Sequence, residues 1–142
     1  MNRYAAILRV YQAHRGATFR WGKNDCLAFV IACAEAIGCG NDLVRRRAEF
    51  QYASEAEANA IMVAQGWRGL GDLAASLWNC IPVAQAQTGD WALIVNDGGA
   101  ETLGVVVRDT VVAQTAKGAG VVPLRQARSA YRVSAQAKSR AA

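Results

Sequence analysis

The 142-residue chain lacks any apolar run long enough to cross a membrane as a helix. Such a helix needs about 18 consecutive apolar residues, and Arg, Gln, Asn or Gly interrupts every candidate run. We also expect no secretory signal, because residues 1–4 lead directly into an amphipathic pattern without an apolar core or a small-residue cleavage site. We therefore expect a protein without a membrane span that is synthesised and first folds in the cytoplasm.

Metal-binding patterns are missing as well. The four cysteines, Cys26, Cys33, Cys39 and Cys80, include no CxxC pair, and His14 is the only histidine. No Cys/His cluster has the spacing of a metal site, so we expect neither a metal nor another cofactor. We expect reduced thiols, with Cys33, Cys39 and Cys80 as small core residues.

Acidic residues are missing from the last part of the chain. The net charge is +5, and six basic residues follow Asp109 without an acidic one among them: Lys117, Arg125, Arg128, Arg132, Lys138 and Arg140. A basic strip of this kind is most often solvated, and no nucleic-acid-binding motif accompanies it. We expect no nucleic-acid partner, and we expect residues 134–142 to be a frayed basic tail.

Length and composition predict a single domain over residues 1–142. With 53% hydrophobic residues the chain can fill one core, and it contains no internal repeat or linker. Helical periodicity is confined to the part before Pro82, and short strand-like segments follow it. Helices first and strands second is the order of an α+β domain.

Two helices are expected near the N-terminus. Apolar residues at spacings of three and four predict an amphipathic helix over residues 3–13. The apolar run 27–37 predicts a second helix, capped by Asn24 or Asp25. Because this second helix is apolar on almost all sides, it should be the central buried helix.

Three further helical segments precede the strands. Residues 42–48 have helical character, and their three arginines are interpreted as surface charge. Ser54 and Glu57 have the spacing of a capping box, which opens the next helix. Asp72 is expected to cap a short helix that runs through Trp78.

The strands are expected in the last third of the chain. Short stretches rich in β-branched or aromatic residues lie at 91–95, 103–107, 110–114, 121–122 and 131–133. Turn sequences separate the first three of them, so neighbouring strands should be antiparallel. The sequence thus predicts a small antiparallel sheet after the helices.

Cys26 is the residue with the clearest chemical potential. It falls in the first turn of the central helix, where unpaired backbone N–H groups and the helix dipole favour a thiolate and lower the thiol pKa below about 8.5. Asp25 would oppose this effect if its carboxylate pointed inward, but its position favours a capping role. A buried structural cysteine is the alternative interpretation.

Four short motifs occur in an order that resembles a known family. They are Trp21-Gly22-x-x-Asp25-Cys26, Thr88-Gly89-Asp90-Trp91, Leu103-Gly104 followed by three valines, and Tyr131-Arg132-Val133. This order, over about residues 4–133, resembles the NlpC-type papain-like cell-wall cysteine peptidases. Within that superfamily the chain is most similar to small proteins of unknown function encoded in phage and prophage tail gene clusters. The resemblance implies a papain-like fold in which helices precede an antiparallel sheet.

The same resemblance assigns roles to four residues. Cys26 takes the place of the nucleophile, and Thr102 takes the place of the histidine that serves as base. Thr102 cannot accept a proton near neutral pH, and Gln114, in the place of the third, orienting residue, has no imidazole to orient. His14 is the alternative base, because it precedes the loop that leads to Cys26, but a lone histidine near a helix C-terminus more often interacts with the dipole or packs.

Two functional hypotheses follow. The first is a structural and interaction protein of the phage tail tip or baseplate, with a degenerate peptidase domain that docks onto hub and central fibre proteins in the virion. The second is an active thiol peptidase that opens peptidoglycan during infection, with Cys26 as nucleophile and a base from His14 or a partner chain. The missing histidine favours the first.

Overall fold

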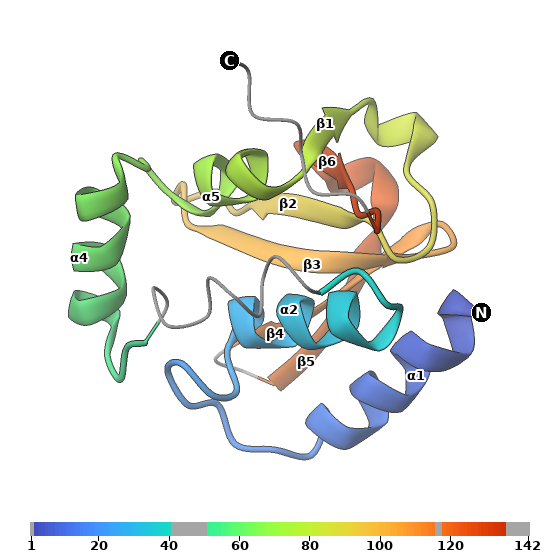
Figure 1. Cartoon of the computed structure of the whole chain (residues 1–142), viewed down its shortest axis with the longest axis horizontal. Helices are drawn as coiled ribbons and strands as arrows, with labels where there is room; N and C mark the ends of the chain where they lie inside the picture. Colours follow the sequence, from blue (N-terminus) through green and yellow to red (C-terminus); the bar gives the residue numbers. More distant parts are fainter. Residues whose placement is uncertain (1, 41–50, 116–117, 136–142) are drawn as a thin grey trace.

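A computed structural model describes residues 2–40, 51–115 and 118–135, and these form an α+β arrangement (Figure 1). The α-helices of the described residues are α1 (Arg3–His14), α2 (Cys26–Ala36), α4 (Glu55–Gln65) and α5 (Leu70–Leu77). The strands are β1 (Asn79–Ile81), β2 (Trp91–Val95), β3 (Glu101–Val107), β4 (Thr110–Thr115), β5 (Gly118–Pro123) and β6 (Ser129–Arg132). Short 3-10 turns, η2 (Val83–Gln85) and η3 (Leu124–Gln126), complete the set. The predicted order, helices first and strands second, is confirmed.

The six described strands form one sheet in the order β1-β6-β2-β3-β4-β5. Every neighbouring pair is antiparallel, and β2 to β5 form a meander in chain order. The last strand, β6, lies between β1 and β2. All five predicted strand segments overlap a strand of the sheet, whereas β1 was not predicted.

Helix α2 packs across β3 and β4 and supplies the centre of the main core (Figure 1). Its buried residues are Leu27, Phe29, Val30, Ile31, Cys33 and Ala34. They meet buried residues of β2 and β3 and of α5, among them Trp91, Leu103 and Leu73. The prediction of a central buried helix is confirmed. A smaller cluster around Ala92, Val106 and Val111 lies apart from this core and packs against residues in and beside η2 and η3.

Two of the three predicted helix caps are confirmed. The carboxylate of Asp25 accepts the backbone N–H of Ala28 at the start of α2, and the hydroxyl of Ser54 accepts that of Glu57 at the start of α4. The prediction for Asp72 is wrong, because α5 begins earlier, at Leu70, and Asp72 lies inside its first turn. The carboxylate of Asp72 accepts the backbone N–H of Arg68 instead, at 2.8 Å.

The described cysteines are free thiols, as expected. Cys33 and Cys39 are buried in the core, which confirms their predicted role. Cys80 is exposed, so the prediction of a core position for it is wrong. The reason is its place on β1, which lies at one edge of the sheet and has two exposed residues among its three.

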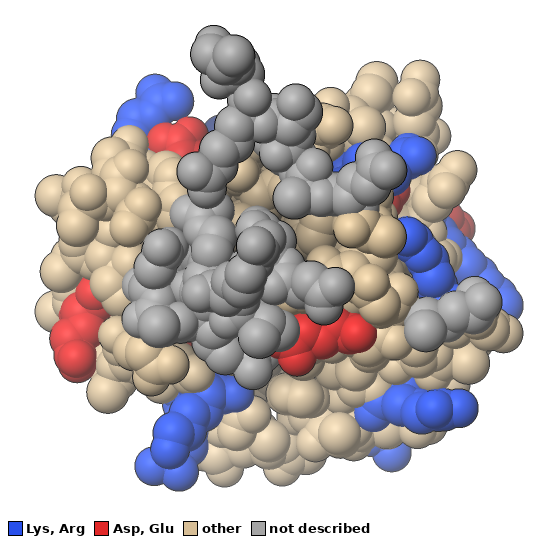
Figure 2. Space-filling model, in the orientation of Figure 1, with Lys and Arg blue, Asp and Glu red and all other residues tan. Residues whose placement is uncertain are grey.

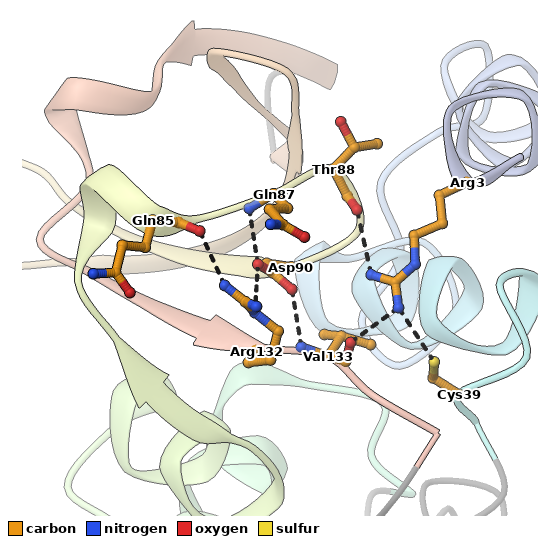
Figure 3. Close-up of polar contacts among 8 residues, drawn as sticks. All are labelled: Arg3, Cys39, Gln85, Gln87, Thr88, Asp90, Arg132 and Val133. Carbon is orange, nitrogen blue, oxygen red and sulfur yellow. Dashed lines mark hydrogen bonds and ion pairs between the residues drawn. The ribbon is translucent and has the colours of Figure 1, made fainter.

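Two of the motifs meet beside β6 (Figure 3). The carboxylate of Asp90 accepts the backbone N–H groups of Gln87 and Val133 and forms an ion pair with the guanidinium of Arg132. Arg132 also donates to the carbonyl of Gln85 at 2.9 Å. Arg132 was expected as part of a solvated strip. Its guanidinium is instead held by these contacts, because Arg132 lies at the end of β6 beside the buried Asp90.

Some predictions fall outside the described residues. These are the helical segment 42–48 with its arginines, residues 136–142 of the expected tail, and Lys117, Lys138 and Arg140 of the basic strip. In the part of the chain that the structure describes, no helix has the length and apolar character that a membrane crossing requires.

Candidate functional site

A cavity of about 790 Å³ opens at the N-terminal end of α2. Its wall comes from the loop before α2, from α4, from the start of α5, and from β3 and β4. The cavity brings together Cys26, Thr102 and Gln114, three of the four residues singled out from the sequence. The fold thus gathers residues that lie up to 88 positions apart in the chain, from Cys26 to Gln114.

The start of α2 is fixed by a network around Asp25. One carboxylate oxygen accepts the N–H of Ala28, and the other accepts the N–H of Gly22 at 2.8 Å and the hydroxyl of Tyr52 at 2.5 Å. Asp25 is only 3% exposed, so its carboxylate has lost most of its contact with water. These three hydrogen bonds compensate for that loss. The network holds Cys26 at the first position of the helix, as predicted.

Gly22 is required by the same network. Its φ of 78° lies in the left-handed region that residues with a Cβ rarely adopt, and a Cβ there would collide with the backbone carbonyl of Tyr52. The spacing of Gly22, Asp25 and Cys26 in the first motif therefore has a structural basis. Tyr52 itself was missed, because no local pattern marks a side chain that acts through a partner 27 positions away.

The predicted lowering of the Cys26 pKa is wrong in this structure. Burial raises the pKa of the thiol to about 11, and the carboxylate of Asp25 adds to the increase. The backbone N–H groups of Leu103, Leu27 and Cys26 itself favour the thiolate but do not outweigh the loss of water. With a pKa this far above neutrality, the thiol is predominantly protonated near neutral pH.

The group that β3 presents to the Cys26 sulfur is the backbone N–H of Leu103, next to Thr102. Thr102 lines the cavity, but it pairs with Ile94 across β2 and β3, and Ile94 packs with the smaller cluster that lies apart from the α2 core. Because side chains alternate along a strand, the Thr102 side chain shares that face, while Leu103 belongs to the core around α2. The structure therefore places neither an imidazole nor the threonine hydroxyl where a base for Cys26 is needed.

Gln114 is the polar side chain of β4 on the α2 side of the sheet. It lies two residues after Val112, which belongs to the core around α2, so both share one sheet face. Gln114 is only 2% exposed. Among the described residues its amide nitrogen has no hydrogen-bond partner, which is costly for a buried donor.

His14 lies away from this cavity. Its Nδ1 is 2.9 Å from the carbonyl oxygen of Val10, one turn earlier in α1, and its ring packs edge-to-face on Phe29. It lines a second, smaller hollow whose wall does not include Cys26. The structure thus gives His14 the packing role, and it does not bring this imidazole to the Cys26 cavity.

The cavity is lined by more acidic than basic groups. Its described wall holds the carboxylates of Asp25, Glu55, Asp72 and Glu101, and a single cation, Arg68. Asp72 is paired with Arg68 at 3.3 Å. This acidic character was missed from the sequence, because the four carboxylates come from four separate segments of a chain whose net charge is positive.

The described residues define an α+β domain with a cavity around a helix-start cysteine, without an adjacent imidazole. Residues 2–133 match the family described as a domain of unknown function, DUF6950, and the chain belongs to that family. No curated protein matches the chain in sequence.

Proposed function

We propose that the chain is a catalytically inactive relative of the NlpC-type papain-like cysteine peptidases, and that it acts as a structural and interaction component of a phage tail tip or baseplate. The observation that carries the proposal is the setting of Cys26. Its thiol lies at a helix start inside a cavity, as a nucleophile would, yet burial keeps it protonated and no described imidazole reaches it.

Amide hydrolysis by a thiol requires a base to remove its proton. A thiol pKa of about 11 leaves little thiolate near neutral pH. Thr102 cannot supply the missing base, because a hydroxyl does not accept a proton at that pH. A cavity that lacks a base can still bind a peptide, although it cannot cleave one. This combination is expected of a peptidase-like domain that functions in binding.

The tail-tip setting rests on the resemblance to proteins encoded in tail gene clusters, and it is supported by the motifs over residues 4–133. The partners would be the hub and central fibre proteins of the baseplate. In the virion, the domain would contribute contacts to that assembly and not an enzymatic step.

The test is a cleavage assay with the purified full chain. We expect no release of stem-peptide fragments from peptidoglycan, measured by mass spectrometry, and the same result for Cys26→Ser. In a phage that encodes this chain, we expect Cys26→Ser to preserve both tail assembly and infectivity. Cleavage by the wild type that Cys26→Ser abolishes would refute the proposal.

One observation favours the alternative of an active thiol peptidase. The backbone N–H groups of Leu27 and Leu103 act on the Cys26 sulfur and favour its thiolate. A partner chain that inserted an imidazole into the cavity would complete such a site. Infectivity lost in Cys26→Ser with assembly preserved would support this alternative.

A further inference from the structure

The cavity at Cys26 contains a buried hydrogen-bond donor without a described partner. Of the polar side-chain atoms that are buried and unpaired, those of Trp78 and Trp91 lie where the two rings pack edge-to-face in the core. The amide nitrogen of Gln114 differs from them, because Gln114 lines the cavity. A buried donor of this kind is satisfied when a bound molecule brings an acceptor such as a carbonyl oxygen.

The charge of the cavity wall indicates a second feature of such a molecule. The carboxylate of Asp25 is occupied by Tyr52, Gly22 and Ala28, and Asp72 is paired with Arg68. Glu55 and Glu101 then remain, and no described cation forms an ion pair with either of them. A positively charged group would therefore be favoured in the cavity.

The wall also offers apolar and aromatic surface. Phe19 and Trp21 line the cavity and pack edge-to-face on each other, and Trp21 is 39% exposed. Ile61, Met62 and Leu70 line the cavity from α4 and the start of α5. Aromatic rings and carboxylates together suit a cation on an aliphatic stem, as in a lysine side chain.

Figure 2 shows how the charges are distributed over one face of the molecule. Basic side chains gather at the margin near the N-terminus and α1, and acidic side chains are visible near α4, at the centre of this face and at its right-hand side. At the α4 side, Glu55 begins the helix and lines the cavity, so its carboxylate would attract a basic segment of another protein.

We propose that the cavity binds an extended, lysine-containing peptide segment of a partner protein. In this arrangement, a backbone carbonyl of the segment accepts a hydrogen bond from the Gln114 amide, and the lysine ammonium pairs with Glu101 and Glu55. The inference rests on the proposed function, since it assigns a binding role to a cavity that has lost its base. It names the chemistry of the segment through which the domain would dock.

The test uses three pentapeptides with blocked ends, Gly-Gly-X-Gly-Gly, in which X is lysine, norleucine or glutamate. Binding to the isotope-labelled full chain is followed by two-dimensional NMR at low salt. We expect the lysine peptide to shift the side-chain amide signals of Gln114, which are assigned by their loss in Gln114→Met. We expect affinity to be about tenfold weaker for norleucine, and weaker again for glutamate.

Two pairs of variants separate the contacts. Gln114→Met removes the donor at similar volume, and we expect about tenfold weaker binding of the lysine peptide, whereas the exposed Gln126→Met should bind as the wild type does. Glu101→Gln removes the charge and should reduce both affinity and its salt dependence, whereas Asp109→Asn, in the turn before β4, should not. Amide spectra with native dispersion establish that each variant is folded.

Each outcome decides one proposal. Equal binding of lysine and norleucine peptides, an absence of shifts at Gln114, or unchanged affinity in Gln114→Met would overturn the basic-segment inference and leave the inactive-domain proposal in place. Cleavage of a peptide would overturn the inactive-domain proposal instead, and the charge preference would then be measured in Cys26→Ser.

Discussion

Nε of Arg132 lies 3.2 Å from a carboxylate oxygen of Asp90, a residue without exposed surface. The pair joins the start of β2 to the end of β6, two neighbours in the sheet that are far apart in the chain. Asp90 also accepts the N–H groups of Gln87 and Val133. Two motifs of the sequence therefore serve the architecture, and they are separate from the chemistry of the cavity.

We predict that Asp90→Asn lowers the free energy of unfolding by about 2–4 kcal/mol. The change removes the negative charge that pairs with Arg132. It also replaces one of the two acceptor oxygens by an NH2 group, so that the backbone N–H of either Gln87 or Val133 loses its acceptor. Urea unfolding followed by fluorescence measures the effect. Asp109→Asn is the control and should fall within about 0.5 kcal/mol of the wild type. Equal unfolding midpoints for the two variants would show that the pair is not stabilising.

Gly22→Ala should destabilise the fold by about 2–4 kcal/mol. Gly22 already has a left-handed backbone conformation, which an alanine adopts only with strain, and the added methyl group would collide with the carbonyl of Tyr52. Gly16→Ala is the matched control, because a Cβ at Gly16 meets no atom within 4 Å, and it should be neutral or slightly stabilising. Thermal unfolding of the two variants side by side gives the comparison, and a Gly22→Ala variant as stable as Gly16→Ala would contradict the geometry of the loop.

Tyr52→Phe should reduce stability near neutral pH by about 1–3 kcal/mol, because the buried carboxylate of Asp25 loses a donor. Burial raises the pKa of Tyr52 above its ordinary value, and the hydrogen bond to Asp25 adds to the increase. Tyrosine in the unfolded chain loses its phenol proton at a pH of about 10. The stabilisation from the Tyr52 hydroxyl is therefore complete below that pH and is lost as the pH rises above it.

Urea unfolding at a series of pH values tests the Tyr52 prediction. The difference between wild type and Tyr52→Phe should be constant from pH 7 to about 9 and then shrink. A difference that grows at alkaline pH would mean that the hydroxyl is not the donor to Asp25.

Alkylation of Cys26 by iodoacetamide should rise with pH beyond the range of an ordinary thiol. With a pKa of about 11 the thiolate fraction at pH 8 is about 100-fold lower than that of a thiol with the reference value of 9.0. Peptide mapping by mass spectrometry separates Cys26 from the exposed Cys80, which provides a rapidly labelled reference. A labelling curve for Cys26 that levels off near pH 8.5 or below would contradict the buried setting and favour the peptidase alternative.

The local patterns in the sequence were sufficient for most elements of the fold. Helices α1, α2 and α4 follow from apolar spacing and from the caps Asp25 and Ser54, which act within four residues of themselves. Strand β2 was predicted with its observed bounds, Trp91–Val95. Strand β1 was missed because it has three residues, Asn79, Cys80 and Ile81, and owes its conformation to pairing with β6.

The site was predictable in position but not in its physical state. The helix-start position of Cys26 follows from the sequence, whereas its pKa depends on how completely β3 and the helices exclude water. The sheet face of Thr102 depends on the register with β2, which one sequence does not determine. The acidic wall of the cavity results from four distant segments and has no local signal.

The position of β6 has a consequence for how the chain acquires its fold during translation. This strand is synthesised last among the described strands, yet it fills the gap between β1 and β2. Until residue 132 has left the ribosome, β2 retains an unpaired side that is open to other chains. Premature termination would therefore expose an internal strand rather than simply shorten a tail, and the truncated products should be prone to aggregate.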